Sequence, residues 1–289
     1  MRDPMINAVT DAMTDEMTDH VEVKFWGTRG SLAVNGPAHK VFGGNTSCIE
    51  MRSSGQSIIF DAGSGLLACG EALLARGVTE IDIFLTHFHA DHLCGLPFFQ
   101  PFFEPAFSVR LHSFDTGVAT TEAAVDAYMR PPLFPVTRDI FTAKVEYFTH
   151  KSDAKVDIGG YHIDACPIPH PGGAHALRAT RDTRICVYAT DTEHQPGAPN
   201  AALIDFMSQA DLAIYDCTFS DEEFDARLGW GHSTWQEGVR LARAASVKQF
   251  AIFHHDPKRT DSALHDIENK ARQMFDGAFA ARDFQTVEL

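Results

Sequence analysis

The segment THFHADH, residues 86–92, contains four side chains that can bind metal, and it directly follows the apolar run IDIFL. The four are His87, His89, Asp91 and His92. In an extended chain His87 and His89 point to the same side, so their imidazoles can converge on one ion. Asp91 and His92 follow where the chain turns toward a helix and can reach a second ion. Mixed imidazole and carboxylate ligands suit divalent cations, so the segment predicts two metal ions, with zinc expected and manganese or iron admitted.

The pattern H-x-H-x-D-H formed by these residues resembles the signature of the metallo-β-lactamase superfamily. Further motifs of the family match in the expected order, and they are Asp61 in IIFDAG, His170 in IPHPGG, Asp191 in YATD and His254 in IFHH. The resemblance extends from Val21 to about Asp261. It implies an α/β fold, the four-layer αββα sandwich, with the metals at the mouth where loops from both sheets meet.

The resemblance also implies a role for each ligand. One ion would be held by His87, His89 and His170, the other by Asp91, His92 and His254, and Asp191 would bridge the two.

Three neighbouring residues leave alternatives open. His175 could replace His170, although the His-Pro-Gly-Gly sequence favours His170. His255 could replace His254, but it would point the opposite way from a strand, which favours His254. Asp61 is expected to orient a ligand or the loop and not to bind metal.

Two segments, YDCTFSDEEF and GHST, resemble the part of tRNase Z-type enzymes in which a carboxylate supports a catalytic histidine. By that match Asp216 orients His232, although the family usually has glutamate at the first position. The leaving alkoxide of a phosphodiester departs more readily when it is protonated, so His232 is the candidate general acid. Asp91 is a second catalytic candidate, able to take a proton from the attacking water.

The opening FWGTRGSLAVNGP…FGGNTSC resembles a bacterial group of phosphodiesterase-like metallo-hydrolases. In this loop Asn45, Thr46 and Ser47, together with Gly43 and Gly44, could bind substrate through backbone N–H groups and hydroxyls that face an oxyanion. An ordinary tight turn explains the same residues equally well.

The net charge of −15, from 24 basic and 39 acidic side chains, predicts repulsion of a polyanion over most of the surface. A long nucleic acid is therefore not expected as a substrate. The expected function is that of a binuclear phosphodiesterase acting on a small molecule, such as a cyclic nucleotide, with the aromatic residues 98–107 available to stack a base. Alternatives are hydrolysis of a lactone, thioester or β-lactam on the same fold, a non-hydrolytic di-iron protein, and a binding module.

The polar, acidic residues 1–20 are expected to form a flexible tail, and residues 21–289 a single domain. Strands alternate with helices in the second half of the chain, which predicts sheets covered by helices. Residues 97–150, rich in proline and aromatic residues, are interpreted as an insertion that roofs the pocket, with ordinary core as the alternative. Ser233 and Gln236 are expected to form a capping box that begins the following helix.

Six singly spaced cysteines, with no signal peptide and no long apolar run, predict a reducing cytoplasm and no membrane insertion. The sequence does not indicate the oligomeric state, and a homodimer stays open.

Overall fold

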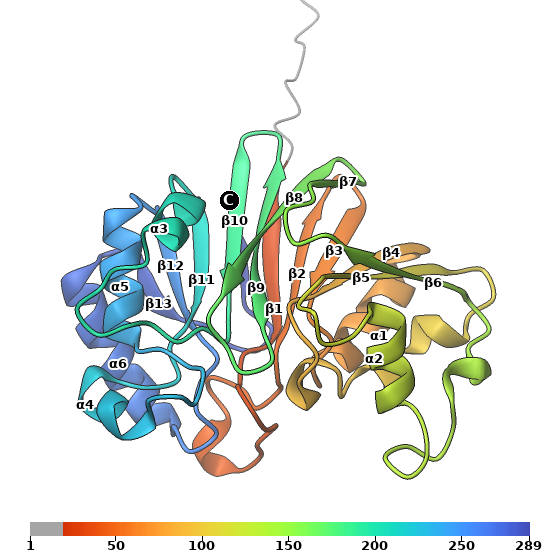
Figure 1. The fold of residues 1–289 in the computed structure, drawn as a ribbon, viewed down its shortest axis with the longest axis horizontal. Helices are drawn as coiled ribbons and strands as arrows, with labels where there is room; N and C mark the ends of the chain where they lie inside the picture. Colours follow the sequence, from red (N-terminus) through yellow and green to blue (C-terminus); the bar gives the residue numbers. More distant parts are fainter. Residues whose placement is uncertain (1–19) are drawn as a thin grey trace, which may run out of the picture.

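Two seven-stranded sheets pack face to face in the computed structural model, which describes residues 20–289, and helices cover the outer side of each sheet (Figure 1). This arrangement confirms the expected αββα sandwich. The predicted tail lies outside the described residues apart from His20.

The first sheet has the order β14-β1-β2-β3-β4-β5-β6. Its strands are β1 (Glu22–Gly27), β2 (Cys48–Ser53), β3 (Gln56–Phe60), β4 (Glu80–Leu85), β5 (Ser108–Phe114), β6 (Lys144–His150) and β14 (Thr286–Glu288). Pairing is antiparallel from β14 to β3 and parallel from β3 to β6.

The second sheet has the order β13-β12-β11-β10-β9-β8-β7. Its strands are β7 (Val156–Ile158), β8 (Tyr161–Ile168), β9 (Ala174–Arg181), β10 (Arg184–Ala189), β11 (Leu212–Asp216), β12 (Gln249–Phe253) and β13 (Ala278–Ala280). Pairing is antiparallel from β7 to β10 and parallel from β10 to β13.

The helices lie on opposite sides of this pair of sheets (Figure 1). On the first sheet they are α1 (Leu66–Arg76) and α2 (Thr121–Tyr128), and on the second α3 (Ala201–Met207), α5 (Trp235–Ala244) and α6 (Asp261–Met274), with the short α4 (Asp221–Phe224) beside them. Short 3-10 turns are η1 (Pro37–His39), η2 (Ala90–His92), η3 (Leu96–Phe98), η4 (Gln100–Phe103), η5 (Arg138–Ile140) and η6 (Asp225–Arg227).

The N-cap of helix α5 lies one residue later than the predicted capping box. The N-cap is Thr234, whose hydroxyl accepts the amide of Glu237 at 3.1 Å. The hydroxyl of Ser233 is engaged elsewhere, 2.7 Å from Nδ1 of His194 and 2.9 Å from the Tyr215 hydroxyl. The prediction for Ser233 was therefore wrong, because a tertiary contact takes the side chain that the local pattern assigned to the cap.

Three apolar layers hold the sandwich together. The central layer lies between the sheets and contains buried residues such as Phe25, Phe60, Tyr188 and Phe253. One outer layer joins α1 and α2 to the first sheet, and the other joins α3, α5 and α6 to the second. Burial of apolar surface in these layers fixes the sheets relative to one another, and with them the loops at the edge.

Residues 97–150 contain two strands of the first sheet, β5 and β6, so this part of the segment is ordinary core, the alternative to a roofing insertion. Strands β5 and β6 extend this sheet in parallel from β4, so their backbone groups are paired within it. Phe99 and Phe102 are fully buried in the layer beneath α1. Phe98, in contrast to Phe99 and Phe102, is 57% exposed.

All six cysteines lie within residues 20–289 and are free thiols. Among the same residues, no helix combines the length and the apolar character needed to cross a bilayer.

Candidate metal centre

Strands from both sheets end at one edge of the sandwich, and each delivers a polar side chain there. Asp61 and His87 follow β3 and β4 of the first sheet, while Asp191, Asp216 and His254 lie at the ends of β10, β11 and β12 of the second. Carboxyl ends of parallel strands are where α/β folds place their sites. Asp61, Asp191 and His254 have positive φ angles of 60°, 54° and 56°, a conformation that costs energy in non-glycine residues and is frequent at functional sites.

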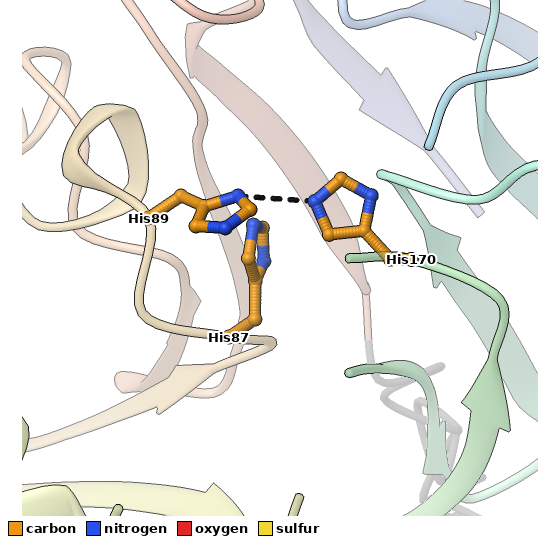
Figure 2. Close-up of side chains that lie close together, drawn as sticks. All are labelled: His87, His89 and His170. Atoms are coloured by element: carbon orange, nitrogen blue, oxygen red, sulfur yellow. Dashed lines mark hydrogen bonds between the residues drawn. The ribbon is translucent and has the colours of Figure 1, made fainter. Parts of the chain in front are cut away.

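Three histidines converge at this edge (Figure 2). They are His87 and His89 from the loop after β4, and His170 from the loop before β9. Their ligand atoms all lie within 4.8 Å of one another, and Nδ1 of His89 approaches Nε2 of His170 to 3.0 Å. Nδ1 of His170 lies 2.8 Å from the carbonyl oxygen of Gly231, which orients the ring and leaves Nε2 for a ligand bond.

A second group forms around Asp191. Its Oδ2 lies 3.1 Å from Nε2 of His92 and 3.1 Å from Nε2 of His254, and Oδ2 of Asp91 lies 3.3 and 3.4 Å from the same two nitrogens. The other oxygen of Asp191, Oδ1, faces the first group, 3.9 Å from Nε2 of His87 and 3.7 Å from that of His170. One carboxylate thus touches both groups, as a bridging ligand must.

The residues present fit divalent cations. Among the described residues, Nε2 of His87, His92 and His254 are buried nitrogens with no hydrogen-bond partner. An unpaired buried polar atom costs free energy, and a cation between these nitrogens and the carboxylate oxygens would remove that cost. The side chains at this edge of the sandwich therefore fit divalent metal ions.

Buried partners fix the orientation of the ligands. Asp61 is fully buried and lies 2.7 Å from Nδ1 of His92, which turns Nε2 of this ring toward the centre. The same carboxylate accepts the hydroxyl of Tyr188 at 2.9 Å and the amide of Thr86 at 2.8 Å. These contacts match the supporting role expected for Asp61.

Burial and neighbouring charges shift the pKa values of the candidate ligands in different directions. Burial, followed by the positive charge of His92, lowers the pKa of His87 well below its usual value. Burial also lowers the pKa of His89 and His170. Burial alone would raise the pKa of Asp191, but the neighbouring histidines outweigh it and hold this pKa well below the usual range. Burial would lower the pKa of His92, but Asp91, Asp61 and Asp191 raise it well above its usual value. Neutral imidazoles and ionised carboxylates are the forms that bind cations, so a bound cation would take the place of the His92 proton.

A carboxylate–histidine pair adjoins the cluster. Oδ2 of Asp216 lies 2.8 Å from Nδ1 of His232, and Oδ1 accepts the amide of Thr218 at 3.0 Å and its hydroxyl at 2.8 Å. Asp216 is fully buried, while the side chain of His232 is 12% exposed. Burial would lower the pKa of His232, but Asp216 and then Asp191 raise it to about 9. The imidazolium form needed to donate a proton is therefore favoured at neutral pH.

The backbone amides of residues 44–46 form hydrogen bonds within the protein. The amides of Gly44 and Asn45 both donate to Asp283 at 2.9 Å, and the amide of Thr46 donates to the hydroxyl of Ser64 at 2.9 Å. These N–H groups are therefore not available to an oxyanion, which corrects the expectation for the loop backbone. A substrate contact through the side chains of Asn45, Thr46 or Ser47 stays a prediction.

The two alternative histidines have other partners. Nε2 of His255 lies 2.9 Å from the carbonyl oxygen of Ala281 in the core. Nε2 of His175 lies 2.7 Å from the hydroxyl of Ser152. The structure thus brings His170 and His254 to the centre.

Sequence reasoning missed several residues that hold the centre in place. The amide of Ser31 donates to Oδ2 of Asp91 at 2.7 Å, and the hydroxyl of Thr218 lies 3.0 Å from Nδ1 of His254. The carboxylate of Glu193 accepts the amides of Gly229 and Gly231 at 2.9 and 2.7 Å. In the sequence, only its position two residues after Asp191 indicates that Glu193 lies near the centre.

Comparison with known proteins identifies the fold and the family. The Beta-lactamase superfamily domain matches residues 56–255. A ribonuclease Z from Haloferax volcanii is 25% identical over 320 aligned positions, covering 92% of this chain and 94% of that protein. Among solved structures, the metallo-β-lactamase fold protein YhfI from Bacillus subtilis has a TM-score of 0.73 at 20% identity, covering 94% and 100% of the two chains. The short form of human tRNase Z has a TM-score of 0.63 at 18% identity, covering 92% and 98%.

These relatives overturn one expectation. Ribonuclease Z and tRNase Z are named for action on RNA and tRNA, so the argument from net charge against a long nucleic acid was wrong. Net charge averages over the whole surface, whereas binding depends on the local potential at the site, which bound cations make positive. The motifs, the fold and the matched residues together show that the chain belongs to the β-lactamase superfamily and is a metal-dependent hydrolase.

Proposed function

We propose that this protein is a phosphodiesterase that cleaves RNA with two zinc ions. The observation that carries the proposal is the pair formed by Asp216 and His232 beside Asp191, with Nδ1 of His232 2.8 Å from Asp216 and 3.8 Å from Oδ1 of Asp191. Hydrolysis of a lactone or β-lactam has no strict need for such an acid, whereas expulsion of a ribose alkoxide does. The names of the ribonuclease Z relatives support RNA as the substrate.

The ligand set supports two ions and favours zinc. Five of the seven candidate ligands are histidines, which suit zinc better than the harder cations do. When bound, the ions would supply Lewis-acid activation of water and of the phosphoryl group, and would neutralise charge in an in-line displacement.

The chain's own residues supply the proton transfers and the geometry. Protonated His232 would donate its Nε2 proton to the departing oxygen, while Asp216 holds Nδ1 and stabilises the imidazolium. Asp91, whose pKa His92 and His254 lower against the opposing effect of burial, would accept a proton as the attacking water loses it. Asp61 and Thr218 would keep the imidazoles of His92 and His254 in position.

The test compares substrates that differ in their leaving group. We would measure kcat/KM for a short RNA, for bis-p-nitrophenyl phosphate, for a lactone and for a β-lactam, with the zinc-loaded wild type and with His232→Ala. We expect cleavage of RNA and of the aryl diester. His232→Ala should lower the rate on RNA roughly 100-fold or more, and that on the aryl diester much less, because p-nitrophenolate departs without protonation. Turnover of lactone or lactam alone would contradict the proposal.

A further inference from the structure

One tryptophan, Trp230, is exposed to solvent close in sequence to the candidate general acid His232. Trp230 is 63% exposed, whereas the other two tryptophans of the chain, Trp26 and Trp235, are 5% and 6% exposed. It lies two residues before His232 on the loop between η6 and α5. A large, rigid aromatic side chain in this position offers a flat binding surface at little cost in conformational entropy.

Hydrogen bonds fix the loop that carries this indole. Gly229 and Gly231 flank Trp230 with φ angles of 85° and 82°, and both amides donate to the carboxylate of Glu193. The carbonyl of Gly231 in turn lies 2.8 Å from Nδ1 of His170. The backbone at Trp230 is therefore tied to a candidate metal ligand, so the loop that carries the indole is held in place relative to the centre.

Ring contacts connect Trp230 to the general acid. The ring centroid of Phe219 lies 6.4 Å from that of Trp230 and 5.9 Å from that of His232. The guanidinium of Arg227 lies 4.9 Å from the same Phe219 ring. The indole of Trp230 and the guanidinium of Arg227 thus lie on the Phe219 ring, which also contacts His232. A nucleotide has a base that can stack on the indole and a phosphate that can pair with the guanidinium.

We propose that Trp230 stacks on a nucleobase of the substrate next to the scissile phosphate. This inference rests on the proposed function and adds a substrate-binding residue to it. Aromatic stacking accepts any base, because every base has a π-face, so the contact would give affinity with little sequence preference. The aromatic residues 98–107 fit this role less well, since Phe99 and Phe102 are buried. The exposed rings of Phe98 and Phe103 contact Phe134 and Phe141, whereas Trp230 is connected through Phe219 to His232.

The test measures binding of adenosine 5′-monophosphate and of inorganic phosphate to the zinc-loaded protein by calorimetry and tryptophan fluorescence. The nucleotide should quench the fluorescence of the wild type, and inorganic phosphate should not. Trp230→Ala should weaken nucleotide binding roughly 5- to 100-fold, and Trp230→Phe should retain most of the affinity while losing the fluorescence response. Phe98→Ala, which removes another exposed aromatic ring, should bind the nucleotide like the wild type.

Equal nucleotide affinity in Trp230→Ala and wild type would overturn the inference, as would a loss confined to Phe98→Ala. The outcome is separable from that for the proposed function. RNA cleavage with no contribution of Trp230 to nucleotide binding would leave the phosphodiesterase standing without the stacking contact. Trp230-dependent nucleotide binding without RNA or diester cleavage would mean that the proposed reaction is wrong while the base-binding surface exists.

Discussion

The pair of Asp216 and His232 gives a prediction whose size follows from the structure. Burial would lower the pKa of His232, but Asp216, followed by Asp191 and Asp91, raises it to about 9. In Asp216→Asn the largest of the raising effects is gone while burial remains, and the pKa should fall to about 6.5 or lower, the value of an unperturbed histidine. At pH 8 a pKa of about 9 leaves His232 mostly protonated, whereas one of about 6.5 leaves about 3% of it protonated.

The variant should therefore lose about 30-fold in kcat/KM on RNA at pH 8 and less than about twofold at pH 6, from the change in protonation alone. The assay is the pH profile of kcat/KM between pH 6 and 9 with the zinc-loaded enzyme. Asp211→Asn is the matched control, because it also removes a buried carboxylate, one that accepts the amide of Ile185 at 2.8 Å in the second sheet. An alkaline limb at the same pH in wild type and Asp216→Asn, with metal content unchanged, would refute the reasoning.

Three further predictions concern the ligand supports and the core. Asp61→Asn should weaken metal binding roughly 10- to 100-fold in a chelator competition, because Nδ1 of His92 then faces a neutral amide in place of a carboxylate. An unchanged affinity would show that the Asp61 carboxylate does not support the site. Glu193→Ala should leave two loop amides without an acceptor, at about 1–3 kcal/mol each, and so speed amide exchange of residues 229–231; unchanged exchange would contradict this role. Burial, and then Arg29, lowers the pKa of His255 to about 3, so the unfolded chain binds the extra proton below about pH 6.5 and stability falls as the pH drops. Between pH 7.5 and 5, urea unfolding should show a loss about 2 kcal/mol smaller in His255→Gln than in wild type, and equal losses would argue against this buried neutral histidine.

The parts of the site that the sequence predicted are those set by short-range geometry. His87, His89, Asp91 and His92 follow one buried strand within six residues, so their convergence depends on little besides the strand and the turn after it. His254 was also correctly preferred to His255, although both residues lie just after β12 and His254 has a positive φ angle, so strand alternation is not the cause.

The parts that it did not predict depend on contacts between distant segments. Asp283 accepts hydrogen bonds from the amides of Gly44 and Asn45, which lie more than two hundred residues earlier in the chain. No local sequence pattern predicts that contact. Strands β5 and β6 escaped prediction because their apolar residues are interleaved with charged ones and surrounded by proline-rich turns. The error on nucleic acid arose because the sequence gives the total charge but not its distribution in space.

The metal content of the purified protein tests the central claim most directly. Elemental analysis after zinc supplementation should give close to two ions per chain in the wild type. Asp191→Ala should hold fewer, since this carboxylate faces both groups of ligands, whereas His175→Ala, which removes a histidine bonded to Ser152, should retain two. A wild-type protein without bound metal, or an Asp191→Ala variant that still holds two ions, would contradict the account.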